Sequence, residues 1–284
     1  MKKFKPVQFI NKETGEVFTS EQIITKFEVV PDNKASYQDF KISNIFMNES
    51  LGYYFHLLYG DILSLNLEPQ MLIRFLKLCS YLNYENVLVT GVTRGQKKIT
   101  EKDLEVILNL KKREAINTKN YLVSNNLISI DDDLIEIKTK FIKRGELNGD
   151  IKSMEVTRIF NNGIKELYDN VKPIQHKKLA TFIKILPYIS IKYNVICENP
   201  LEEDITLIKP LTWTELGRRI GLSEATAKRL RSELWNFKID NSVTIGEFST
   251  LSCGKAIVVN PSVYYKGNDM DSLKGIINLF KLQK

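Results

Sequence analysis

Residues 211–234 read LTWTELGRRIGLSEATAKRLRSEL, a stretch typical of two short helices joined by a tight turn. Thr212 and Ser223 are residue types that cap helix N-termini. Gly217 lets two helices approach closely, and Gly221 suits a corner with left-handed backbone angles. Together with the cations around the turn, this pattern predicts a helix-turn-helix, whose second helix enters the DNA major groove.

The second helix has an apolar stripe at helical spacing, which we expect to be buried: Ala227, Leu230 and Leu234. The remaining side chains are the candidate DNA contacts. Those expected at base edges and nearby phosphates are Ser223, Ala225, Thr226, Lys228 and Arg229. Those expected to neutralise phosphates are Arg218, Arg219, Arg231 and Lys255. An ordinary helical hairpin with a solvated basic face is the alternative.

A weaker copy of this pattern lies upstream, over residues 99–122. The two stretches align without gaps, pairing Thr100 with Thr212, Leu104 with Leu216, Leu110 with Leu222, Ala115 with Ala227, and Leu122 with Leu234. The helices expected before them also match, pairing Leu72, Phe75, Lys77 and Tyr81 with Leu179, Phe182, Lys184 and Tyr188. Agreement across several elements indicates a tandem repeat rather than a chance likeness of two helical segments.

Each copy continues into a run typical of a β-hairpin. The first hairpin covers residues 127–137, with the acidic turn Asp131-Asp-Asp133, and the second covers residues 242–259, with a loop from Ser249 to Gly254. Each copy then closes on a basic residue and a glycine, Arg144-Gly145 and Lys266-Gly267. The order of helix, helix-turn-helix and hairpin is that of a winged helix. The predicted fold is therefore mainly α with small β-hairpins (α+β), built as tandem winged helix-turn-helix domains.

The other segments are expected to connect these two domains. A hairpin with Gly15 at its turn is predicted for Val7–Phe18, followed by a helix over Ile42–Leu65. A linker helix is predicted for Met154–Asp169, an exposed acidic loop facing away from DNA for Glu198–Asp204, and an amphipathic tail helix for Ser272–Leu282. The predicted domains are an arm (1–65), the first winged helix (66–150), the linker (151–172), the second winged helix (173–270) and the tail (271–284).

Composition narrows the class of protein. The chain has 284 residues and a formal net charge of +7, which favours a polyanionic partner without identifying it. Its three cysteines, Cys79, Cys197 and Cys253, lie far apart, so neither a disulfide framework nor a zinc site is expected, and a cytoplasmic location fits. No apolar run approaches the length of about 20 residues that a membrane helix needs, so no membrane partner is expected.

Enzymatic interpretations lack the residues that they require. The only two histidines, His56 and His176, are far apart and are expected to be surface or packing residues rather than metal ligands of a relaxase. The stretch from Gly91 to Gly95 lacks the Ser or Thr that would hold Mg²⁺ in a phosphate-binding loop. The paired tyrosines at 53–54 and 264–265 are expected to be core or interface aromatics rather than nucleophiles. We therefore expect no enzyme, no metal and no cofactor.

Both ends of the chain resemble the RepL replication proteins of Firmicute plasmids, which also occur in phages. The stretch INKETGEV at 10–17 is similar to that family's opening hairpin, and VNPSVYYKGND at 259–269 is similar to the segment after its wing. Members of that family are shorter and carry one winged helix, so the second copy is a departure. Two winged helices in one chain resemble the iteron-binding plasmid initiators, which use a pseudo-twofold pair to grip origin repeats. These resemblances imply that a mobile-element protein binds origin or operator DNA.

In the first copy, the helix equivalent to the base-reading one is expected to contact phosphates more than bases, because it lacks a capping serine. Its candidate contacts are Lys111, Lys112, Arg113, Asn117, Lys119 and Asn120. The acidic hairpin turn would repel DNA, so a structural or dimerisation role for this copy is the alternative.

The leading expectation is a sequence-specific protein that binds double-stranded DNA and initiates replication. A transcriptional repressor of a phage or plasmid operon, and a winged-helix module that binds other proteins, stay open as alternatives. Host replication proteins or RNA polymerase would be the further partners of the first two roles. The tail helix leaves a homodimer open.

Overall fold

The computed structural model describes residues 8–10, 17–19, 33–91, 95–138, 140–145, 147, 155–250 and 254–281. The chain divides into two compact units, Met1–Ile45 and Phe46–Lys284. In the first unit β1 (Gln8–Ile10) pairs antiparallel with β2 (Val17–Thr19), which confirms the predicted N-terminal hairpin. The predicted turn residue Gly15 lies outside the described residues. Helix α2 (Asn33–Leu51) begins in the first unit and ends in the second.

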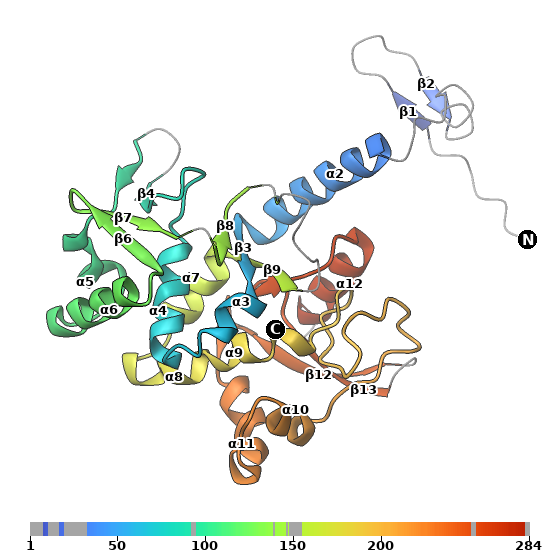
Figure 1. Ribbon diagram of the computed structural model, residues 1–284. Coiled ribbons are helices and arrows are strands. Elements are labelled where there is room, and N and C mark those ends of the chain that lie inside the picture. The colour runs from blue at the N-terminus through green and yellow to red at the C-terminus, as the bar shows by residue number, and fades with distance from the viewer. Residues whose placement is uncertain are drawn as a thin grey trace, which may run out of the picture. The chain divides into compact units, whose positions relative to one another are not determined.

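The second unit mixes helix and sheet, which confirms the α+β class. Its central sheet has four antiparallel strands in the order β14-β9-β3-β8, of which β9, β3 and β8 are labelled in Figure 1. The inner strands are β3 (Tyr54–Leu58) and β9 (Val156–Phe160), and the outer strands are β8 (Ile142–Lys143) and β14 (Tyr264–Tyr265).

The two inner strands lie where the sequence predicts helices, so both of those predictions are wrong at the strands, whereas residues 42–51, 59–64 and 161–169 are helical as predicted. Residues 42–65 contain the end of α2, then β3 and then α3 (Tyr59–Ser64). The predicted linker helix is β9 followed by α7 (Asn161–Asp169), and all five residues of β9 are buried. A short run buried on both faces shows no alternation, so periodicity cannot tell it from a buried helix.

The remaining elements follow a similar order in both copies, with some elements present in one copy alone among the described residues. After β3, the first copy contains α3, α4 (Pro69–Cys79), β4 (Val89–Thr90), β5 (Lys97–Lys98), η1 (Glu101–Asp103), α5 (Leu104–Ile107), α6 (Lys112–Ser124), β6 (Ile128–Asp131), β7 (Leu134–Ile137) and β8. After β9, the second contains α7, η3 (Pro173–Gln175), α8 (His176–Leu179), α9 (Thr181–Lys184), η4 (Leu186–Tyr188), α10 (Trp213–Arg219), α11 (Glu224–Trp235), β10 (Lys238–Ile239), β11 (Ser242–Val243), β12 (Ile245–Thr250), β13 (Gly254–Val259) and β14.

Equivalent backbone hydrogen bonds support the sequence repeat. The Leu110 amide donates to the Glu105 carbonyl around Asn109, and the Leu222 amide donates to the Gly217 carbonyl around Gly221. Asn109 and Gly221 both have positive φ, 47° and 78°. In the hairpins, the Ile137 amide donates to the Asn86 carbonyl just as the Val259 amide donates to the Asn194 carbonyl. The hairpin of β6 and β7 therefore corresponds to that of β12 and β13.

The second copy contains one hairpin that the sequence prediction missed. Strands β10 and β11 pair across Asp240 and Asn241, both with positive φ, before β12 begins at Ile245. The predicted loop from Ser249 to Gly254 is also too long, because β12 runs to Thr250 and β13 starts at Gly254. The start of the predicted hairpin, residues 242–246, is thus divided between β11 and β12, which belong to different hairpins.

The copies meet across the inner strands in a register that is symmetric about the pair of His56 and Arg158. His56 lies opposite Arg158, Phe55 opposite Ile159 and Leu57 opposite Thr157. Strand β8 then joins β3 in the same way that β14 joins β9. Such self-complementary pairing is characteristic of a twofold interface, which here lies within a single chain.

The predicted tail helix is present as α12 (Met270–Lys281). Its apolar face, formed by Leu273, Ile276 and Phe280, is buried in a core cluster that also contains Met47 and Val258. The tail is therefore part of the core of the second unit. Among the described residues, no helix combines the length and apolar character needed to cross a bilayer.

Candidate nucleic-acid interface

The start of helix α10 is fixed by a reciprocal cap. The Thr212 hydroxyl accepts a hydrogen bond from the Glu215 amide at 3.3 Å, while the Thr212 amide donates to the Glu215 carboxylate at 2.8 Å. This capping box satisfies two amide groups that have no partner within the helix. The predicted cap at Thr212 is confirmed.

Two glycines set the angle between α10 and α11. A Cβ atom on Gly217 would lie 2.3 Å from the Cβ atom of Ala227, a distance that no side chain can occupy. Gly221 has φ +78°, the left-handed conformation in which glycine meets no Cβ strain. Both roles predicted for these glycines are confirmed, and they bring the two helices into direct backbone contact.

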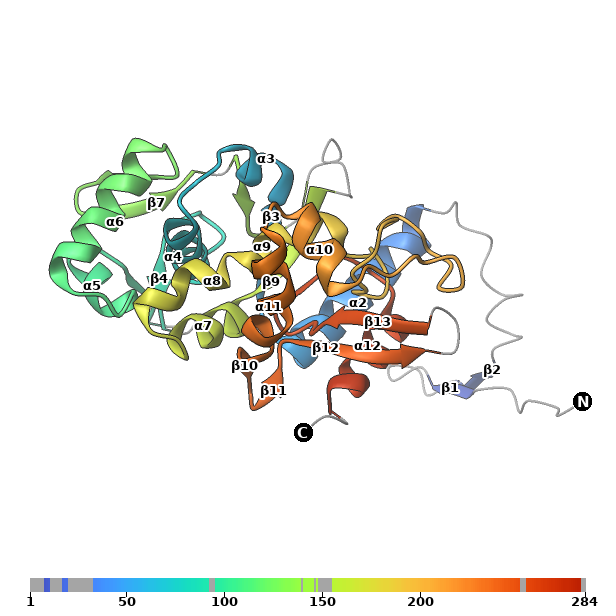
Figure 2. The same cartoon turned by 90° about the horizontal axis from the view of Figure 1, so that it is seen from below.

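Helix α11 has one buried face and one exposed face. Ser223 caps it by accepting a hydrogen bond from the Thr226 amide at 3.4 Å, and the predicted stripe of Ala227, Leu230 and Leu234 is buried. Both views show α11 beside β12 (Figure 1, Figure 2). Of the predicted contacts in this copy, Thr226 is half-buried and the rest are exposed: Arg218, Arg219, Ser223, Ala225, Lys228, Arg229, Arg231 and Lys255.

The exposed cations differ in whether a carboxylate already pairs with them. Four of them do have such a partner: Arg219 with Glu198, Lys228 with Glu224, and both Arg231 and Lys255 with Glu247. Within the described part of the chain, Arg218 and Arg229 make no ion pair. These two guanidinium groups are the ones with charge left for an external anion.

Glu198, the first residue of the acidic loop, contacts this surface, whereas the sequence predicts that the loop faces away from DNA. The Glu198 carboxylate lies 2.6 Å from the Arg219 guanidinium. Sequence position alone could not place it there, because 21 residues separate the two. One predicted phosphate contact is therefore partly neutralised by the protein itself.

Glu247, on β12, lies within this surface and was not among the predicted site residues. Its carboxylate accepts a hydrogen bond from the Trp213 indole of α10 and lies 2.9 Å from Arg231 of α11 and 3.1 Å from Lys255 of β13. Burial alone would raise the pKa of Glu247, but hydrogen bonds from Lys255 and Trp213, together with nearby positive charge, hold it below its ordinary value. Glu247 thus ties both helices to the hairpin. No sequence signal marks a single acidic residue in a strand.

Replacing Glu247 by glutamine should release Arg231 and Lys255 from their shared carboxylate. We expect the affinity for duplex DNA of unrelated sequence to rise on the order of 10-fold at low salt. The lost charge-assisted hydrogen bonds should lower the free energy of unfolding by about 1–3 kcal/mol. Fluorescence anisotropy and thermal melting measure the two effects.

Glu224→Gln, in an exposed pair with Lys228, is the matched control with little effect on stability. Unchanged or weaker non-specific binding of Glu247→Gln contradicts this role.

The first copy has a different surface at the equivalent positions. Where the second copy has Arg218 and Lys228, the first has Val106, 81% exposed, and Ile116, 42% exposed. Of the predicted contacts, Lys119 forms an ion pair with Glu101 and is half-buried. The others are exposed: Lys111, Lys112, Arg113, Asn117 and Asn120. Cations and apolar side chains thus share this face.

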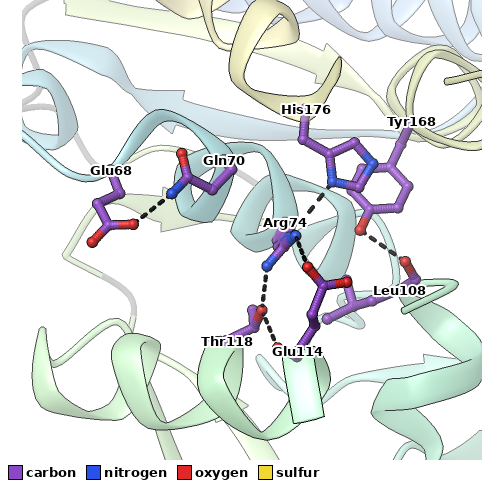
Figure 3. Close-up of polar contacts among 8 residues, drawn as sticks. All are labelled: Glu68, Gln70, Arg74, Leu108, Glu114, Thr118, Tyr168 and His176. Carbon is purple, nitrogen blue, oxygen red and sulfur yellow. Dashed lines mark hydrogen bonds and ion pairs between the residues drawn. The ribbon is translucent and has the colours of Figure 1, made fainter. Parts of the chain in front are cut away.

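A buried arginine, which the sequence prediction also missed, joins the two copies. Figure 3 shows Arg74 of α4 between Thr118 of α6 and His176 of α8. Its guanidinium donates to the Thr118 hydroxyl at 2.9 Å and to His176 Nδ1 at 3.5 Å, and lies 3.7 Å from the Glu114 carboxylate. The His176 ring stacks on that of Tyr168 at 4.2 Å. This cluster fixes the first copy against the second.

Both histidines are buried packing residues, in agreement with one of the two roles expected for them. Burial, and then the Arg158 charge, lower the pKa of His56 to about 3. Burial, and then the Arg74 charge, lower the pKa of His176 to about 4. Nowhere in the described ranges do three or more His, Cys, Asp or Glu side chains gather closely enough to hold a metal ion.

Comparison with protein-family models, with curated proteins and with solved structures gives no match to this chain. Its function therefore has to be inferred from its own residues and their geometry.

Proposed function

We propose that this chain is a sequence-specific protein that binds double-stranded DNA through tandem winged helices, and that it initiates replication of a plasmid or phage. Helix α11 is the recognition helix, and the hairpin of β12 and β13 is its wing. The observation that carries the proposal is the exposed pair of guanidinium groups on α10 and α11, Arg218 and Arg229, which have no carboxylate partner among the described residues. An arginine that reaches guanine with two hydrogen bonds is the commonest specific contact in the major groove.

The proposed roles of the two arginines follow from their positions. Arg229 lies in the second turn of α11, and its Nε donates to the Ala225 carbonyl at 3.3 Å, which leaves the Nη groups free to reach a base. Arg218 lies in the last turn of α10, next to the turn, where a phosphate is the closer target. Lys255 on β13 gives the wing a cation for the neighbouring backbone.

The two copies have different roles in DNA binding. The second copy reads bases, because its helix pair has free cations. The first copy follows the phosphate backbone with Lys111, Lys112 and Arg113, because its outer face has Val106 and Ile116 in place of Arg218 and Lys228. These exposed apolar residues are also the observation that favours the second candidate function for this copy, contact with another protein.

The pairing of equivalent strands supports DNA binding through two related elements. A twofold arrangement inside one chain presents two related DNA-binding elements to one duplex, as in the iteron-binding initiators that the repeat resembles. Repeated origin sequences offer a matching target.

Selecting bound fragments from the DNA of the source element tests the proposal. We expect enrichment of short repeats that lie together at the replication origin. Enrichment of a single promoter operator would instead assign the protein to transcriptional repression. Recovery of no sequence above background would contradict sequence-specific binding altogether and leave the protein-binding alternative.

A further inference from the structure

Two tyrosines stand out on the surface of the second unit. Tyr53 and Tyr84 are 61% and 69% exposed, and they are the only exposed aromatic residues among those for which the structure describes the side chain. The sequence predicts a core or an interface position for Tyr53, and its exposure excludes the core. The two residues come from different segments: Tyr53 immediately precedes β3, and Tyr84 lies between α4 and β4.

Both tyrosine rings face the same cation. The Cζ atom of Arg144 lies 5.6 Å from the ring centroid of Tyr53 and 4.8 Å from that of Tyr84. Arg144 is half-buried, and its Nη1 donates a hydrogen bond to the Leu82 carbonyl. The guanidinium is thus held in place by the backbone, and the two rings flank a fixed charge.

The surroundings of this cluster carry positive charge. The Nζ atom of Lys165 lies 3.8 Å from the ring centroid of Tyr81. Burial, and then the neighbouring charges of Lys77 and Arg144, lower the pKa of Lys165 to about 8. Lys77 is paired with Asp169 at 2.6 Å, whereas across the described residues Arg144 and Lys165 form no ion pair. Asp169 offsets only part of the charge of Lys77, Lys165 and Arg144, so an anion near the tyrosines would find an excess of positive charge.

The second copy provides an internal comparison. Lys266 is the counterpart of Arg144, and its Nζ donates to the Ile189 carbonyl, just as Arg144 donates to that of Leu82. Where the first copy has Tyr53 and Tyr84, the second has Glu155 and Ile191, and with Lys266 these help to line a mainly apolar cavity of about 310 Å³. The hydrogen bond from the basic side chain to the backbone carbonyl is therefore present in both copies, with the exposed tyrosines only in the first. A structural role of that bond does not explain the two tyrosines.

We propose that Tyr53, Arg144 and Tyr84 form a stacking site for unpaired bases of single-stranded DNA. Every base has a flat face that can stack on a tyrosine, and such a contact is worth about 1–3 kcal/mol per base. The guanidinium and Lys165 supply the charge that a flexible phosphate backbone needs. The inference rests on the proposed function in one respect: an initiator has to hold a strand of the melted origin after it binds the duplex.

The test uses the full chain and a fluorescently labelled oligothymidylate of about 20 nucleotides, a length that exceeds a typical single-strand binding site. Replacing both Tyr53 and Tyr84 by alanine should weaken binding on the order of 100-fold, measured by anisotropy. Replacing both by phenylalanine should keep the affinity within about 3-fold, because the ring faces remain. Equal binding of the alanine variant and the wild type overturns the proposal.

A second measurement needs no variant and so does not depend on folding of the alanine protein. An oligonucleotide with 5-iodouracil in place of thymine, cross-linked to the wild type by light, should attach at Tyr53 or Tyr84. Cross-links confined to other residues overturn the proposal.

The two proposals can fail separately. If the alanine variant loses oligothymidylate binding but the wild type selects no duplex, the stacking site stands and the proposed function is contradicted. The reverse result, selection of a duplex with no effect of the tyrosines, would leave the function and remove the stacking site.

Discussion

Replacing Arg218 and Arg229 together by alanine is expected to lower the affinity for the selected duplex on the order of 100-fold or more. Arg229 should lose a base contact worth about 1–3 kcal/mol, and Arg218 a phosphate contact. Both side chains are exposed and lack ion-pair partners among the described residues, so the fold should not change. Titration of the duplex at several salt concentrations, with circular dichroism to check folding, measures the effect.

The two single substitutions separate the two roles. Arg229→Ala should relax the preference at one base pair, whereas Arg218→Ala should weaken all duplexes alike and reduce the salt slope by about one unit. Lys228→Ala is the matched control, because Glu224 already pairs with that lysine at 3.0 Å, and its effect should be smaller than either. Full specific affinity in the Arg229→Ala protein would contradict the assignment of that side chain.

Lowering the pH from about 7 to about 5 is expected to destabilise the fold by about 4 kcal/mol, through the two buried histidines. His56 and His176 have pKa values lowered to about 3 and about 4, below the usual value of 6.5. Both are therefore neutral in the folded protein over this range. In the unfolded chain both take up a proton once the pH falls below their usual pKa.

The sign of the effect follows from proton binding. Between these pH values the unfolded state binds more protons than the folded state, so acidification favours unfolding. Each histidine contributes about 2 kcal/mol at about pH 5, since its unfolded pKa lies about 1.5 units above that pH. Paired carboxylates such as Glu247 have lowered pKa values, so the stability that they contribute is lost only at lower pH.

Chemical denaturation at several pH values measures this dependence. Replacing His176 by glutamine removes one titrating group, so the loss between about pH 7 and about pH 5 should shrink by about half. Glutamine at position 56, opposite Arg158 at the centre of the sheet, gives the same test for the other site. A free energy of unfolding that is constant over this range would show that the histidines are accessible to protons in the folded protein.

Local sequence patterns predicted the elements that local chemistry determines. Caps at Thr212 and Ser223 and the turn at Gly221 are read from residues a few positions apart, and the structure has all three. The repeat was visible for the same reason, because equivalent turns and stripes recur in the two copies. The hairpin across Asp240 and Asn241 could have been found as well, since Asp and Asn tolerate the positive φ that its turn requires.

The missed features depend on partners far away in the chain. Strands β3 and β9 are defined by pairing with each other, with His56 opposite Arg158, and their own residues also suit a buried helix. Arg74 and Glu247 gain their roles from residues on other elements, such as His176 and Trp213. Ion pairs with distant carboxylates determine which cations of the candidate interface are free. The spacing of residues along the chain does not predict these pairs.

Methylation interference on the selected duplex tests most directly whether α11 lies in the major groove. Guanine N7 is exposed only in that groove, and it is one of the two acceptors that an arginine such as Arg229 contacts. We expect methylation of N7 at one or two guanines of the site to abolish binding by the wild type, and to matter less for Arg229→Ala. Binding that is indifferent to N7 methylation throughout the site would contradict the proposed interface.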